Sequence, residues 1–227
     1  MKHSGKARLA ALKLVFWTLT GLMVIFVAGI LAVELGRVIW EISLVLVGFW
    51  VVFAGFTFYF FRDPEAKVPS GPGLVVSPAH GKVDIVDQVT EPLFMGGPCQ
   101  RISIFLSVID VHVQNAPVGG KVAFYKYSTG QFLSALKTES AEHNENVLLG
   151  IAAKEDGVKI GLRLIAGVLA RRIVPFVKEG DEPARGERIS LIQFGSRTDL
   201  YLPLSATLKI KPGDRVVGGE TVMATLK

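Results

Sequence analysis

Two long runs of uncharged residues near the start of the chain constrain its fold more than any other feature. Leu14–Val33 and Ile42–Phe61 are each 20 residues long, and neither contains a charged side chain. An α-helix needs about 20 apolar residues to cross the hydrocarbon core of a bilayer. The first run is too long for the core of a typical signal peptide, and no convincing cleavage site follows it. The pattern predicts two membrane-spanning helices.

The short link between the two runs predicts a helical hairpin. Only Glu34–Glu41 separates them, so the second helix returns the chain to the side where the first began. Basic residues gather before the first run: Lys2, Lys6, Arg8 and Lys13. The link holds Arg37 alone, and by the positive-inside rule both ends of the hairpin then face the cytoplasm. Two buried core helices, or a re-entrant hairpin, are the alternatives that the pattern leaves open.

After the hairpin the sequence changes to short apolar runs broken by Gly, Pro and Asp. We therefore expect residues 1–61 to form a membrane anchor and residues 62–227 to form a separate domain. Short, frequent strands of this kind predict a mainly β (α+β) fold, a sandwich or barrel-like core. The predicted strands are 74–77, 81–89, 101–106, 120–127, 146–153, 157–166, 188–194, 199–202, 207–210 and 221–226. Lys211–Glu220 has the turn–strand–turn pattern of lipoyl-type sandwiches, and Val168–Arg172 fits one helical turn.

Charge and cysteine content exclude several classes of function. Lys and Arg exceed Asp and Glu by 25 − 20 = 5, which suits an anionic membrane or substrate better than a dedicated nucleic-acid binder. The single cysteine, Cys99, rules out an internal disulfide and the Cys-rich zinc patterns. No metal-ligand spacing, nucleophile elbow, Walker loop or dinucleotide fingerprint is present. We therefore expect neither a metal nor a nucleotide cofactor.

A Gly–Ser step late in the chain is the main candidate for chemistry. Gly195–Ser196 lies between two apolar, strand-like segments. Glycine has no Cβ, so its carbonyl is open to attack and its backbone angles are unrestricted. For an isolated step of this kind, a β-bulge or kink is the more common explanation. Two histidines, His80 and His112, lie in loops beside predicted strands, where a histidine is more often structural than catalytic.

Taken together, these segments resemble a phosphatidylserine decarboxylase proenzyme of the short bacterial and archaeal type. The resemblance runs from about Tyr59 to the C-terminus, and it depends on the order and spacing of many pieces rather than on one motif. The matching segments are Phe60–Pro64, Ser77–Val83, Asp110–Pro117, Glu145–Asn146, Ile165–Ile173, Gly186–Arg188 and Phe194–Arg197.

The resemblance implies a self-processing enzyme. The Ser196 hydroxyl would attack the Gly195 carbonyl and split the proenzyme into residues 1–195 and 196–227, which stay associated. Ser196 would become a pyruvoyl group, the covalent cofactor, which forms a Schiff base with the substrate amine and acts as the electron sink for decarboxylation. Phosphatidylserine would then yield phosphatidylethanolamine at the cell membrane, with the catalytic domain in the cytoplasm.

The resemblance also suggests roles for individual residues. His112 matches a histidine near the pyruvoyl group, so we expect it to transfer a proton or position the substrate. Lys82, Arg171 and Arg172 are candidates for holding the substrate phosphate or carboxylate, and a basic patch facing solvent or phospholipid is an equal alternative.

Two positions depart from the family pattern. His80 stands where the family usually has Asp, and Asn115 matches the second histidine of a relay that activates the serine in long-form relatives. We therefore predict that His80 itself deprotonates Ser196.

Three other functions stay open from the sequence. The chain could be a homologue that does not mature, or a non-enzymatic, membrane-anchored adaptor with a lipoyl-like sandwich. The same chemistry could also act on another lipid with an amino-acid head group. The sequence leaves association into a homo-oligomer open as well.

Overall fold

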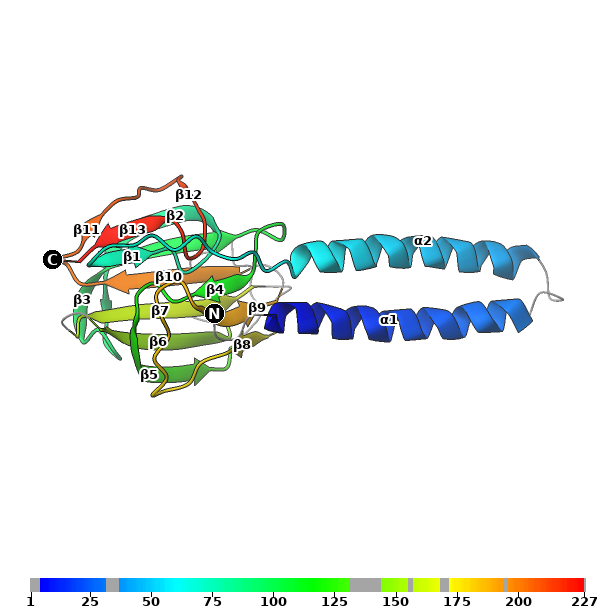
Figure 1. Ribbon diagram of the computed structural model, residues 1–227, viewed down its shortest axis with the longest axis horizontal. Coiled ribbons are helices and arrows are strands. Elements are labelled where there is room, and N and C mark those ends of the chain that lie inside the picture. The colour runs from blue at the N-terminus through cyan, green and yellow to red at the C-terminus, as the bar shows by residue number, and fades with distance from the viewer. Residues whose placement is uncertain are drawn as a thin grey trace. The chain divides into compact units, whose positions relative to one another are not determined.

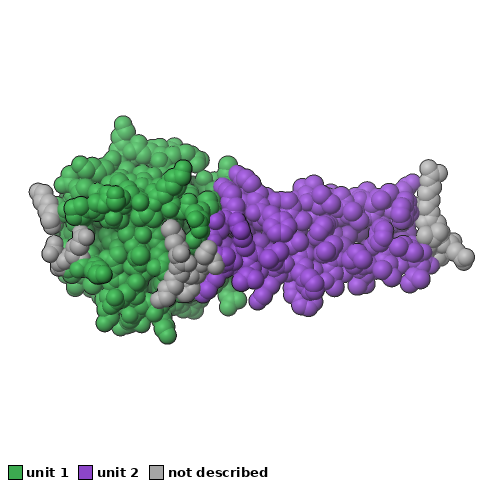
Figure 2. Space-filling view, in the orientation of Figure 1, with its two compact units in different colours: residues 1–4, 64–227 green, residues 5–63 purple. Residues whose placement is uncertain are grey.

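A computed structural model describes residues 5–31, 37–130, 144–154, 157–167, 172–193 and 196–226 of the chain. The chain divides into two compact units, which Figure 2 colours separately. One unit is Gly5–Asp63, and the other contains Pro64–Lys227.

The first unit is a pair of helices, α1 (Lys6–Leu31) and α2 (Arg37–Phe60), labelled in Figure 1. Their backbones approach closely where Gly29 faces Ser43, and Trp50 Nε1 donates a hydrogen bond of 3.0 Å to Thr18 Oγ1 across the pair. Both helices are long and apolar enough to cross a membrane by length and composition. Core helices of a soluble protein are mostly buried, whereas only 11% and 17% of these two apolar windows are buried.

The second unit is built from three antiparallel sheets. Its strands are β1 (Leu74–Val76), β2 (Gly81–Glu91), β3 (Gly97–Leu106), β4 (Val113–Asn115), β5 (Gly120–Ser128), β6 (Asn146–Ala153), β7 (Lys159–Ala166), β8 (Ile173–Pro175), β9 (Arg188–Ile192), β10 (Ser196–Leu202), β11 (Thr207–Leu208), β12 (Arg215–Val216) and β13 (Val222–Thr225). The large sheet has the order β12-β2-β3-β10-β7-β6-β5, and the two small sheets are β1-β13-β11 and β4-β9-β8. In Figure 1, orange β10 lies between β3 and β7.

The core lies between the inner face of the large sheet and the two small sheets. Leu106 and Leu200 of the large sheet pack in one cluster with Met223 of β13. Leu164 of the large sheet packs in a second cluster with Ile189 of β9. Successive side chains of a strand point to opposite faces, so each strand of the large sheet has an inner and an outer row. The architecture is a β-sandwich, as predicted.

The strand predictions hold for the longer strands and for the short strands β1, β11 and β13, and they miss two other short strands. Strands β4 and β8 were not predicted, because three residues carry too little alternation to identify a strand, whereas β12 lies within the turn–strand–turn pattern predicted at Lys211–Glu220. Strand β10 begins at Ser196, three residues before the predicted start, because both β3 and β7 pair with it there. The helical turn predicted at Val168–Arg172 lies outside the described residues except for Arg172.

Candidate active site

Ser196 opens the central strand β10 and is completely buried. It pairs with Leu106 of β3 on one side and with Ala166 of β7 on the other. Within the described part of the chain, its Oγ has no hydrogen-bond partner. Buried hydroxyl groups are nearly always hydrogen-bonded, whereas the Ser196 hydroxyl is free to react, a property that it shares with Thr198 Oγ1 among the described residues. Gly195, the other residue of the predicted step, lies outside the described residues.

The strand pairing brings the segment of His112 to the start of β10. Leu106, at the end of β3, pairs with Ser196, while Val113, at the start of β4, pairs with Leu191 of β9. His112 precedes β4 directly, and its backbone oxygen accepts a hydrogen bond of 3.0 Å from Ile192 N. Strand β3 pairs with β10, and strand β4 pairs with β9. The chain therefore passes between these two pairs of strands twice, once from β3 to β4 and once from β9 to β10.

His112 is 1% exposed, and one of its ring nitrogens is held by the backbone. Its Nδ1 lies 2.9 Å from the carbonyl oxygen of Asp110. A carbonyl oxygen can only accept, so this contact assigns the proton to Nδ1. The neutral ring then carries its lone pair on Nε2, which is the atom able to take up or deliver a proton.

The Asp110 carboxylate fixes the turn that holds His112. Its Oδ2 accepts hydrogen bonds from Ser107 N, at 2.9 Å, and from Ser107 Oγ, at 2.7 Å. Its Oδ1 lies 3.1 Å from Arg215 Nη1. Burial raises the pKa of Asp110, but the hydrogen bonds from Ser107 and the charge of Arg215 outweigh burial and hold that pKa below its usual value. In the sequence, Asp110 was recognised only as the first residue of the matching segment Asp110–Pro117. Arg215 was not predicted as a site residue, because no local pattern marks it.

His80 lies just before β2, beside Asn115. A Cβ built on Gly218 would lie 3.1 Å from His80 Nε2 and 2.7 Å from Asn115 Oδ1, so both side chains press against this glycine. The Asn115 amide nitrogen donates to Gly186 O at 2.9 Å. Because β3 lies between β2 and β10, the strand that follows His80 and the strand that begins at Ser196 are two strand spacings apart, roughly 10 Å.

The three predicted basic residues have different positions. Lys82 is exposed and pairs with Phe105, which itself pairs with Arg197. Directly paired residues share a face, so Lys82 lies on the face of the sheet opposite to Ser196. Arg172 is exposed, and its backbone oxygen accepts a 3.2 Å hydrogen bond from Gln193 N, three residues before Ser196. Arg171 lies outside the described residues.

Arg197, the residue after Ser196, anchors the outer face of β10. Its side chain is 3% exposed and makes a two-pronged ion pair with Asp84, at 3.0 and 2.5 Å. A bidentate pair of this kind restricts both position and orientation. The pair therefore fixes the backbone at the start of β10, a role that sequence reasoning did not predict.

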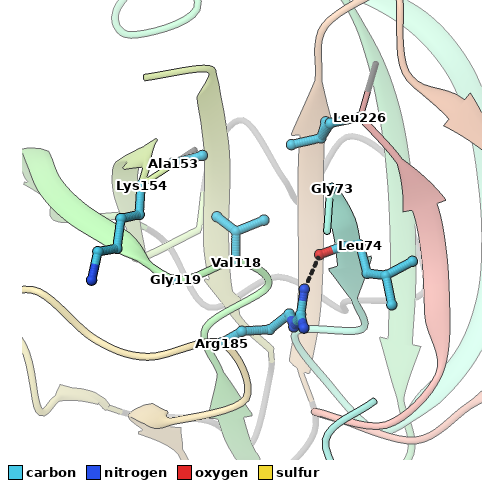
Figure 3. A pocket seen from close by; sticks show the side chains of 8 residues that line it. All are labelled: Gly73, Leu74, Val118, Gly119, Ala153, Lys154, Arg185 and Leu226. Atoms are coloured by element: carbon cyan, nitrogen blue, oxygen red, sulfur yellow. Dashed lines mark hydrogen bonds between the residues drawn. The ribbon is translucent and has the colours of Figure 1, made fainter. Parts of the chain in front are cut away.

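A separate small cavity of about 170 Å³ lies between Leu226 near the C-terminus and Val118 (Figure 3). Arg185 Nη1 donates to Leu74 O at 3.2 Å and to Gly71 O at 2.9 Å. None of the predicted site residues lines this cavity. Because the Arg185 guanidinium donates hydrogen bonds to backbone carbonyl groups, we assign this arginine a structural role.

The fold and the site define a class: a β-sandwich domain that follows an apolar helical pair and holds a buried serine at the start of its central strand and a buried histidine in the segment before β4. The sequence model of a family described as phosphatidylserine decarboxylase matches residues 53–224, which is more than half of the chain. The chain belongs to the phosphatidylserine decarboxylase family, whose members are carboxy-lyases, so the resemblance noted in the sequence is confirmed.

Relatives from three bacteria cover most of their own length and most of this chain. All three are named phosphatidylserine decarboxylase proenzyme. The protein of Symbiobacterium thermophilum is 45% identical over 187 residues, 82% of this chain and 85% of its own. The protein of Gluconobacter oxydans is 44% identical over 203 residues, which are 88% of this chain and 90% of its own length. The protein of Carboxydothermus hydrogenoformans is 39% identical over 218 residues, which are 93% of this chain and 94% of its own length.

Proposed function

We propose that this protein is a self-processing, membrane-bound decarboxylase that converts phosphatidylserine to phosphatidylethanolamine. Membership of the family and the names of its relatives support the reaction. The observation that carries the proposal is the buried Ser196 Oγ, which has no partner among the described residues and stands directly after a glycine in the sequence.

Maturation would start with attack of Ser196 Oγ on the carbonyl carbon of Gly195. The peptide C–N bond breaks, its nitrogen takes up a proton, and an ester joins the two residues. Loss of the Ser196 α-proton then breaks the ester C–O bond and frees the carboxylate of residues 1–195. The dehydroalanine left at position 196 takes up water and loses ammonia, and a pyruvoyl group remains at the start of residues 196–227.

The orphaned Ser196 hydroxyl fits this chemistry because no described hydrogen bond has to break before it attacks. A base must take its proton, and we propose His80, which stands where the family usually has Asp and which lies beside Asn115. When formed, the pyruvoyl group supplies a carbonyl that accepts the electron pair released as carbon dioxide leaves the substrate.

The chain's own side chains would supply proton transfer and binding. His112, with its proton fixed on Nδ1 by Asp110 O, can deliver or accept a proton at Nε2. In the uncleaved chain, full burial of residue 196 surrounds the reacting carbon with protein rather than bulk solvent. We retain Arg172, Arg171 and Lys82 as proposed ligands of the substrate phosphate or carboxylate. Of these, Arg172 has a described contact with the segment that leads to Ser196.

The apolar helices α1 and α2 support attachment to the membrane, where the lipid substrate resides. The basic residues that precede the first uncharged run support a cytoplasmic position for both ends of the pair. Strands β10 to β13 all lie after the proposed cleavage point, and β10 pairs on both sides within the large sheet. This pairing supports association of the two chains after cleavage.

Intact-mass analysis of the purified full-length protein tests the proposal. We expect a fragment of 227 − 195 = 32 residues with a pyruvoyl group in place of its N-terminal serine. Ser196→Ala should leave a single full-length chain and abolish release of carbon dioxide from phosphatidylserine vesicles. Full-length mass alone in the unsubstituted protein would contradict self-processing and favour an adaptor or a homologue that does not mature.

A further inference from the structure

A polar pocket lies on the outer face of the large sheet, away from the site described above. Its volume is about 500 Å³. The residues that line it come from β2, β3, β5, β6, β7, β10 and the turn after β2. Six of them matter here: Leu93, Arg101, Lys126, Asn146, Arg163 and Tyr201.

The pocket is separate from the candidate active site. Tyr201 lies five residues after Ser196 along β10, which corresponds to roughly 17 Å of extended strand. Strand residues at odd separation point to opposite faces, so Tyr201 faces outward while Ser196 faces the core. The two regions therefore lie on opposite sides of the same strand.

Among the described residues, two cations in the pocket form no ion pair with a carboxylate, although Asp199 lies directly across the strands from Arg163. Arg163 Nε donates to the neutral amide oxygen of Asn146 at 3.2 Å. Lys126 makes no hydrogen bond or ion pair within the described part of the chain, and it is exposed. Arg101, by contrast, already forms a bidentate pair with Asp87, at 2.9 and 2.6 Å.

The nearby acids do little to cancel this charge. The Glu91 carboxylate accepts hydrogen bonds of 2.7 to 2.9 Å from three backbone N–H groups of the turn that follows. Asp199 is 1% exposed and does not line the pocket, and burial raises its pKa against the opposing effects of Ser103 and the neighbouring arginines. The residues that line the pocket include three cations, Arg101, Lys126 and Arg163, and one acid, Glu91, so the lining presents net positive charge to an entering group.

We infer that this pocket binds a phosphoryl group. Guanidinium and ammonium groups form their strongest hydrogen bonds with phosphate oxygens. The hydroxyl groups of Ser128 and Tyr201, which also line the pocket, can add neutral donors. Leu93 is 51% exposed at the rim and offers an apolar contact to whatever carries the phosphate. The carrier is a phospholipid head group or a soluble phosphate ester, and the experiment below distinguishes them.

Lysine footprinting of the full-length protein tests the inference without measuring activity. The rate of Lys126 acetylation by an amine-reactive ester is read by mass spectrometry in phosphate-free maltoside detergent alone, with added phosphatidylglycerol, or with added glycerol 3-phosphate. Occupancy of four-fifths of the sites slows the reaction about fivefold. Lys209, an exposed lysine outside the pocket, is the internal control and should keep its rate.

The possible results distinguish a phospholipid head group from a soluble phosphate ester, and one result would overturn the inference. Protection of Lys126 by phosphatidylglycerol alone assigns a lipid head group, and protection by glycerol 3-phosphate assigns a phosphate that needs no acyl chains. In either case Arg163→Gln should remove the protection, whereas Lys209→Gln should not. If neither compound slows acetylation of Lys126 in the unsubstituted protein, the inference is wrong, and the proposed decarboxylase activity is unaffected.

Discussion

Arg215 Nη1 lies 3.1 Å from Asp110 Oδ1, and the proposed cleavage point separates these two residues in the sequence. After cleavage, Asp110 would belong to residues 1–195 and Arg215 to residues 196–227. The small chain would then contribute directly to the turn that holds His112. Arg215 is 67% exposed, so this ion pair is worth at most about 1 kcal/mol, and the buried bonds from Ser107 stabilise the turn more.

Asp110→Asn should impair proton transfer more than it impairs folding. An amide offers one oxygen in place of two, so the turn loses at least one acceptor and His112 loses its fixed position. We expect the turnover rate on phosphatidylserine to fall roughly 10- to 100-fold with little change in KM. Its pH profile should also shift, which a purely structural defect would not cause. The measurement is carbon dioxide release from matured protein.

Arg215→Gln is the matched control for this prediction, because it removes only the exposed partner of Asp110. It should change turnover by no more than a few fold. Equal losses in Asp110→Asn and Arg215→Gln, or no loss in Asp110→Asn, would contradict a positioning role for the carboxylate.

Gly218→Ala should slow self-cleavage. The added methyl group would lie 2.7 Å from Asn115 Oδ1 and 3.1 Å from His80 Nε2, so both side chains must move. We expect a stability loss on the order of 1–3 kcal/mol, the usual cost of overpacking. The fraction of cleaved chain over time, followed on denaturing gels, reports the effect on maturation.

Gly97→Ala provides the comparison, because a Cβ at Gly97 meets no atom within 4 Å. That variant should mature at the normal rate. Normal cleavage of Gly218→Ala would show that the arrangement of His80 and Asn115 is not needed for maturation.

Asp199→Asn should remove a pH-dependent penalty on folding. Burial raises the pKa of Asp199 in the folded protein above its ordinary value of 3.8, against the opposing hydrogen bond from Ser103 and the charges of Arg101 and Arg197. The contribution of this carboxyl to stability is therefore complete below pH 3.8 and is lost as the pH rises through the raised value.

Asparagine cannot ionise, yet its oxygen can still accept the hydrogen bond from Ser103 Oγ, which lies 2.6 Å from Asp199 Oδ1. The stability of the variant relative to the unsubstituted protein should therefore increase as the pH rises. Denaturant unfolding at a series of pH values measures this difference. A difference that stays flat or decreases with pH would show that the surrounding arginines outweigh burial.

Much of the architecture could be predicted from local sequence pattern. The helices α1 and α2 follow from uncharged runs of 20 residues, because length and hydropathy suffice to identify such segments. The longer strands, such as β2 and β6, follow from their apolar runs and from the Gly, Pro and Asp residues between them. Ser196 and His112 could be named because each lies in a continuous motif of the family.

The sequence alone therefore determined the helical pair, the β-rich class and the identities of the serine and histidine, since each depends on neighbouring residues. Only the tertiary structure shows how the segments of the serine and the histidine come together. Pairing of β3 with β10, whose partners are 90 to 102 residues apart, buries Ser196 and brings the start of β10 to the segment that holds His112. The same registers turn Lys82 to the opposite face and join Arg215 to Asp110. Such pairings depend on the packing of the whole domain, and no local pattern encodes them.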